Sequence, residues 1–132
     1  MLTTYGENMD REAPYREHPR PQLKRENWLS LNGPWEFTGS QQDSAPSRFP
    51  GEICVPFPPE SRLSGVNRPT PKGYSLWYRR SFVLPEGFHR GRVLLHFDAV
   101  DQIATVWFNG EKAAEHAGGY TPFTVDVTTL LQ

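Results

Sequence analysis

The sequence predicts an all-β fold, and three observations lead to this prediction. Thirteen prolines and eleven glycines divide the 132 residues with frequent turn signals. Between these turns lie short runs rich in branched and aromatic residues, such as 93–97 and 103–108, which favour a pleated surface. Apolar and polar residues alternate over 123–127, as they do in a half-buried strand. About seven or eight such strands with turns between them are typical of a β-sandwich.

The first part of the chain is expected to form an arm and then the first strands. Residues 1–23 are polar and proline-bearing, which predicts an extended N-terminal arm, and residues 24–132 are predicted to form one sandwich domain. Within this domain we expect strands at 35–38 and 52–55 and one helical turn within 60–63. The longest strand is expected at 73–84, and Pro85 would end it.

The second part of the chain predicts antiparallel strands joined by short turns. Asn109-Gly110 favours a two-residue hairpin turn because both positions need a positive φ, and this turn would join strand 103–108 to strand 111–116. A glycine-rich loop then leads into strand 123–127. Residues 128–132 are expected to form a short closing turn.

Several motifs in this order carry a family resemblance. The run Trp28–Phe37 is followed by Val55-Pro56-Phe57, by Trp77–Phe82, by Val106-Trp107 with Asn109-Gly110, by Glu115-His116 with Gly118–Phe123, and by Asp126-Val127-Thr128. Over roughly residues 20–132 this pattern resembles the N-terminal sugar-binding domain of glycoside hydrolase family 2, which includes β-galactosidases, β-glucuronidases and β-mannosidases. The resemblance does not decide among these sugars.

The resemblance implies a fold and a role. It implies a jelly-roll-like β-sandwich of the galactose-binding-domain type. In that family the two catalytic glutamates lie in a downstream (β/α)₈ barrel, so the parent protein would be a retaining glycosidase that hydrolyses O-glycosyl bonds. The present segment is predicted to be inactive alone, with no catalytic residue, and to contribute a pocket wall and interdomain contacts. Its partners would be a β-glycoside and the barrel domain.

Composition argues against several other functions. The formal net charge of −1 gives no reason to expect a nucleic-acid partner, and no apolar run is long enough to cross a membrane. No signal peptide is visible, so a cytoplasmic location is expected. Cys54 is the single cysteine and is interpreted as a small core thiol. The four histidines show no ligand spacing, so neither a metal nor a cofactor is predicted.

Two loops and one strand residue are the candidate contact sites. Asn67 and Arg68 are candidate donors to sugar hydroxyls, although a solvated proline-rich loop is the favoured interpretation of this stretch. Trp77 is expected to cover the core or a domain interface. An interdomain or sugar contact is also expected for the glycine-rich loop, which consists of Gly118, Gly119, Tyr120, Thr121, Pro122 and Phe123. Asp98 and Asp101 are interpreted as turn residues rather than as an acid/base pair.

Two other functions stay open at this point. The chain could be a stand-alone carbohydrate-binding module, or a structural interaction domain without sugar affinity. No strand pattern follows Thr129, which predicts that the final strand or strands of the sandwich are missing. An open sheet edge of this kind would favour self-association by edge pairing.

Overall fold

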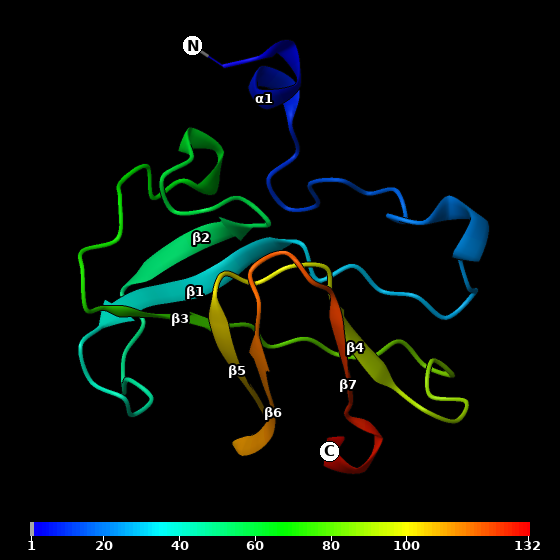
Figure 1. The fold of residues 1–132 in the computed structure, drawn as a ribbon. Helices are drawn as coiled ribbons and strands as arrows, with labels where there is room; N and C mark the ends of the chain where they lie inside the picture. Colours follow the sequence, from blue (N-terminus) through cyan, green and yellow to red (C-terminus); the bar gives the residue numbers. More distant parts are fainter. Residues whose placement is uncertain (1) are drawn as a thin grey trace. The chain divides into compact units, whose positions relative to one another are not determined.

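A computed structural model describes residues 2–132, and these residues form two compact units (Figure 1). Unit 1 extends to Val83 and unit 2 covers Leu84–Gln132; each is described by itself. Unit 1 contains, in order, α1 (Thr4–Asn8), η1 (Pro21–Leu23), β1 (Gly33–Ser40), β2 (Gly51–Val55), η2 (Arg62–Ser64) and β3 (Ser75–Arg79). Unit 2 contains β4 (Leu94–Phe97), β5 (Ile103–Phe108), β6 (Glu111–Ala117), β7 (Phe123–Asp126) and η3 (Thr128–Leu130).

The described strands confirm the all-β class. Every strand pair is antiparallel, and the helical elements are single short turns. The strands form a three-stranded sheet in the order β2-β1-β3 and two pairs, β4-β7 and β5-β6. No helix within residues 2–132 is long and apolar enough to span a bilayer.

The sheet of unit 1 is organised around β1, which lies between β2 and β3 (Figure 1). Ile53 of β2 is completely buried and lies opposite Trp35, and the neighbouring Cys54 is also buried. Phe37 is buried on β1 and meets the edge of the Tyr78 ring, with 5.1 Å between the ring centroids. These apolar side chains form the core of unit 1.

The N-terminal segment is attached to this core by specific contacts. Pro14 is fully buried. The Arg11 guanidinium donates to the carbonyl oxygens of Leu63 and Ser64, at 3.0 and 3.4 Å, beside the turn η2. The backbone carbonyl of Arg11 in turn accepts from the Cys54 thiol at 3.5 Å. Residues 11–14 are therefore part of the packing of unit 1, although their sequence shows no apolar periodicity.

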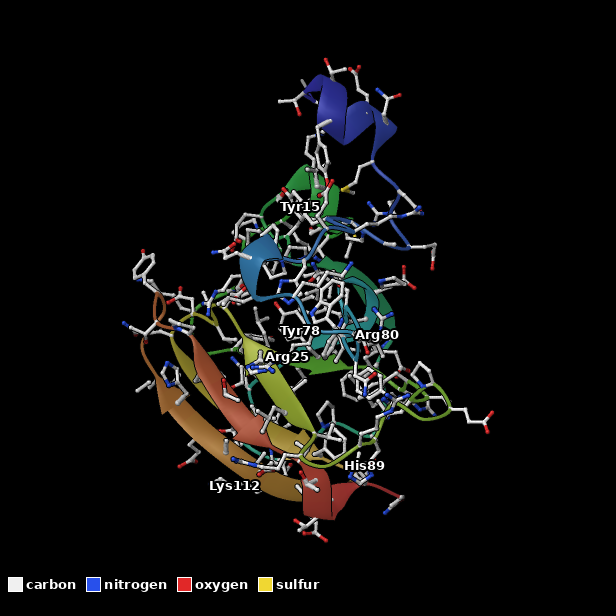
Figure 2. All side chains as sticks on the ribbon, turned by 90° about the vertical axis from the view of Figure 1, so that its right-hand side faces the viewer. Tyr15, Arg25, Tyr78, Arg80, His89 and Lys112 are labelled. Carbon is white, nitrogen blue, oxygen red and sulfur yellow. The ribbon has the colours of Figure 1, made fainter. Side chains whose placement is uncertain are left out.

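Strand β3 is shorter than the expected strand 73–84, so that expectation was wrong. β3 pairs with β1 only from Ser75 to Arg79, where Arg79 lies opposite Glu36. In the same register the strand would next bring Ser81 opposite Pro34, which has no N–H to donate to a ladder. Arg80 instead leaves the sheet, and its Nη1 donates to the carbonyl oxygens of Leu31, Asn32 and Pro34 at 3.1–3.2 Å (Figure 2).

Unit 2 contains the predicted hairpin. β5 has the expected bounds, and Asn109 and Gly110 have φ values of 48° and 84°, as the two-residue turn requires. β6 ends one residue later than expected, at Ala117. The buried side chains of this unit are Ala104, Val125 and Val127.

The end of β7 is held by a cluster of polar contacts around Asp126. The Thr128 hydroxyl and backbone N–H both donate to Asp126 Oδ1, at 2.5 and 3.1 Å, and Arg92 Nε donates to Oδ2 at 2.8 Å. These contacts, those of Thr128 above all, lower the pKa of the Asp126 carboxyl to about 2. The Thr128 hydroxyl also accepts from the backbone N–H of Val93, which ties η3 to the residue just before β4.

Candidate functional site

The candidate site is the loop between β6 and β7, residues 118–122, together with the side chains that hold it. Gly118 has a φ of 135°, which side-chain-bearing residues rarely adopt, so glycine is needed at the point where β6 ends. Its backbone N–H donates to the carbonyl of Gln102 at 2.8 Å, at the start of β5. The loop therefore begins in a fixed position on the β5–β6 hairpin.

A side-chain hydrogen bond closes the loop. Nε2 of His116 lies 3.0 Å from the hydroxyl oxygen of Thr121, across the two glycines. The same imidazole ring stacks on Phe123, with 4.3 Å between the centroids and an interplanar angle of 16°. Phe123 also stacks on Phe97 of β4, with 4.7 Å between the ring centroids. The row His116–Phe123–Phe97 thus links β6, β7 and β4 below the loop.

The connection between β4 and β5 also reaches the loop. A Cβ atom placed on Gly119 would lie 2.5 Å from Oδ1 of Asp101, so the Asp101 side chain occupies the space that a larger residue would need. The Gly-Gly pair in the sequence indicated such a close approach, but nothing in the sequence identified Asp101 as the neighbour.

Tyr120 is at the tip of this braced loop and is 97% exposed. Thr121 and Pro122, which follow it, are exposed as well. A large aromatic ring is therefore presented to solvent by a backbone that is held on both sides. An arrangement of this kind can contact a partner surface without the cost of ordering the loop.

The remaining candidates lie in unit 1. Trp77 is half-buried in β3, and within residues 2–132 its indole Nε1 is buried without a hydrogen-bond partner. Asn67 has a positive φ of 53°, and the backbone N–H of Arg68 donates to the carbonyl of Pro59 at 3.1 Å. Both side chains are exposed on this loop. The contact roles of Asn67, Arg68, Trp77 and the loop Gly118–Phe123 stay predictions.

Histidine, cysteine and acidic side chains could form two other kinds of site, a metal centre or a reactive thiol. Within the described residues, no group of three His, Cys, Asp or Glu side chains is arranged to hold a metal ion. Burial raises the pKa of the Cys54 thiol, and a thiol that stays protonated is a poor nucleophile.

Comparison with known proteins places these features in a family. Residues 69–132 match the family model of the glycosyl hydrolase 2 galactose-binding domain-like domain. The β-glucuronidase of Felis catus is 30% identical over 134 residues, which cover 87% of this chain and 20% of that protein. The β-galactosidase of Thermoanaerobacter pseudethanolicus is 43% identical over 56 residues, which cover 42% of this chain and 8% of that enzyme.

Solved structures agree with the sequence matches. The β-glucuronidase of Bifidobacterium dentium, solved with coumarin-3-O-glucuronide, has 30% sequence identity and a TM-score of 0.61 over 77% of this chain and 17% of its own. The chain spans about a fifth of the length of the β-glucuronidases that it matches. The resemblance seen in the sequence is confirmed: the chain is a galactose-binding-like N-terminal domain of glycoside hydrolase family 2.

Proposed function

We propose that this domain is a non-catalytic part of a longer glycosidase, in which it shapes one wall of the sugar pocket and docks onto the catalytic domain through the loop 118–122. The observation that carries the proposal is the exposure of Tyr120 on a braced loop. Aromatic side chains on ordered backbone are the usual anchors of protein interfaces. A ring that is 97% exposed in this chain has its whole surface available to a neighbouring domain.

The bracing favours docking over a purely flexible contact. The hydrogen bonds at Gly118 and Thr121 and the stack on Phe123 fix the loop before any partner arrives. A pre-organised loop loses little conformational entropy on binding, so more of the contact energy remains as affinity. The close fit of Gly119 against Asp101 serves the same purpose.

The parent activity is proposed from the relatives. Those compared above are a β-galactosidase and two β-glucuronidases, and these names support a β-glycoside as the substrate of the longer protein. Hydrolysis with retention needs two carboxyl groups about 5 Å apart. We assign that pair to the catalytic domain, so the 132-residue chain alone should not hydrolyse 4-nitrophenyl β-D-glucuronide or β-D-galactoside.

The experiment compares Tyr120→Ala with the matched control Tyr74→Ala in the full-length protein. Tyr74 is also an exposed tyrosine, at 40%, but belongs to unit 1. Loss of an interface anchor costs about 2 kcal/mol or more, which is about 30-fold in an equilibrium constant. We expect Tyr120→Ala to uncouple the domain, seen as a separate early unfolding transition and a lower kcat/KM, while Tyr74→Ala behaves like the wild type. If Tyr120→Ala leaves both measurements unchanged, the docking role is wrong.

Titration of the isolated chain separates the two alternatives. A stand-alone carbohydrate-binding module predicts saturable sugar binding that Tyr120→Ala or Trp77→Ala removes. A purely structural interaction domain predicts no sugar affinity and a partner interface that Tyr120→Ala disrupts. The proposed pocket wall predicts that sugar contacts this loop only when the catalytic domain is present.

A further inference from the structure

A second candidate binding site lies in unit 1 and shares no residue with the sites described above. Residues of the N-terminal segment, between Tyr5 and Glu17, line an open surface hollow of about 250 Å³. Its walls include the aromatic rings of Tyr5 and Tyr15, the ring of Pro14, and the polar side chains of Asn8, Asp10 and Arg16. Residues with aromatic rings and residues with planar polar groups therefore line the same hollow.

The aromatic wall is a row of three rings. Tyr5 stacks on Tyr15 with 5.3 Å between the centroids and an interplanar angle of 14°. Tyr15, which is labelled in Figure 2, also contacts Phe57, with 5.8 Å between the ring centroids and an interplanar angle of 39°. Tyr5 stands at the end of this row and keeps 44% of its surface exposed. Tyr5 is therefore a partly exposed aromatic ring that is supported by its stack on Tyr15.

The base of the hollow is fixed to the core of unit 1. Pro14 is fully buried, and Arg11 is anchored to the backbone carbonyls of Leu63 and Ser64. Tyr15 has a φ of 53°, a conformation that is unfavourable for a bulky residue and persists only where the surroundings impose it. This backbone conformation sets the Tyr15 ring into the row beside Tyr5.

The polar side of the hollow is an ion pair between Asp10 and Arg16. Asp10 Oδ1 also accepts from the backbone N–H of Glu12 at 3.0 Å. This hydrogen bond and the contact with Arg16 lower the pKa of the Asp10 carboxyl, so it stays ionised near neutral pH. The Arg16 side chain is 71% exposed and has five N–H donors, of which the ion pair uses only part.

We propose that this hollow binds one pyranose ring of a neutral saccharide. The C–H face of the sugar would cover Tyr5, and its hydroxyl groups would donate to the Asp10 carboxylate and accept from Arg16. Pockets for drug-sized ligands measure about 300–1,000 Å³, so a hollow of this size suits a single ring. The hollow is lined by two acidic residues, Asp10 and Glu17, and by one basic residue, Arg16. This excess of negative charge disfavours an anionic sugar. The proposal is independent of the docking role of Tyr120.

The test is an NMR titration of the 132-residue chain with methyl β-D-glucopyranoside as the probe. We expect saturable shifts of amide signals within residues 5–17. Tyr5→Ala should weaken binding at least about tenfold by removing the stacking ring, and Tyr5→Phe should restore it. Arg16→Gln should also weaken binding. Tyr74→Ala and Tyr120→Ala should bind as the wild type does, which separates this site from the docking loop.

Several results would overturn the proposal. Shifts that grow linearly up to the solubility limit of the sugar, or equal shifts with glycerol, would show a solvent effect instead of a site. Tighter binding of methyl β-D-glucuronide than of the neutral sugar would contradict the ligand class. Unchanged affinity in Tyr5→Ala, with a melting temperature equal to that of the wild type, would exclude the aromatic wall.

Discussion

Replacement of Gly118 by alanine tests how tightly the candidate loop is held, and Gly91 provides a matched control. The two glycines have nearly the same φ, 135° and 131°. Alanine at either position carries backbone strain of about 1–3 kcal/mol. A Cβ at position 91 meets nothing within 4 Å, whereas a Cβ at position 118 would lie 2.8 Å from the Thr121 hydroxyl oxygen. Only Gly118→Ala therefore displaces Thr121 and breaks its hydrogen bond to His116, a further loss of about 0.5–1.5 kcal/mol.

The assay is urea unfolding of the wild type and the two variants, followed by tryptophan fluorescence. We expect Gly91→Ala to lower the free energy of unfolding by about 1–3 kcal/mol, and Gly118→Ala to lower it by about 1 kcal/mol more. In a Thr121→Ala background this excess should disappear, because the colliding hydroxyl and its hydrogen bond are already gone. Equal costs of the two alanine variants, or an excess that survives in the Thr121→Ala background, would refute the bracing of the loop by Thr121.

Three further predictions concern the core, the charge cluster and the loop tip. Ile53 is completely buried, so Ile53→Ala should lower the free energy of unfolding by about 2–5 kcal/mol, and Ile53→Val should lower it by only about 0.5–1.5 kcal/mol. Urea unfolding measures both values, and similar costs of the two variants would place Ile53 outside the core. The pKa of Asp126 is lowered to about 2 from 3.8, chiefly by Thr128, so its contribution to stability is present above pH 3.8 and is lost as the pH falls through about 2. Asp126→Asn should flatten the dependence of the melting temperature on pH in this window, and an unchanged slope would show that other carboxyl groups dominate it. Tyr120→Ala should change the melting temperature of the isolated chain by no more than about 2 °C, because the ring is exposed; a large drop in calorimetry would mean that Tyr120 packs within the domain.

Sequence analysis predicted well those parts of the fold that are determined by residues close to one another in the sequence. The hairpin of β5 and β6 follows from the alternation in residues 103–108 and from Asn109-Gly110, and its turn has the positive φ values expected of that dipeptide. Strand β3 was predicted too long because its end depends on which residue of β1 lies opposite it. In the observed register Pro34 of β1 would lie opposite Ser81, beyond the end of β3. A register between strands about 40 residues apart cannot be read from local periodicity.

The candidate loop was located by its composition, but its supports were not. Gly118-Gly119 followed by Tyr120 indicated an exposed turn with a close backbone approach. The neighbours that make this approach, Asp101 and Gln102, belong to a different connection. In the same way, no sequence pattern indicated that Tyr5 and Tyr15 would stack, since neither lies in a periodic segment.

The contacts of Arg11 and Arg80 have a consequence for the order in which unit 1 assembles. Each guanidinium binds backbone carbonyls about 46–53 residues away in the sequence. The carbonyl partners of Arg11 are at residues 63 and 64, so during synthesis the N-terminal segment leaves the ribosome long before they do. Closing such long loops is entropically costly and tends to come late in folding. We therefore expect the segment around Arg11 to be among the last parts of unit 1 to reach its final place, although it is synthesised before its partners. The nascent domain should stay open to proteases until residue 80 has emerged.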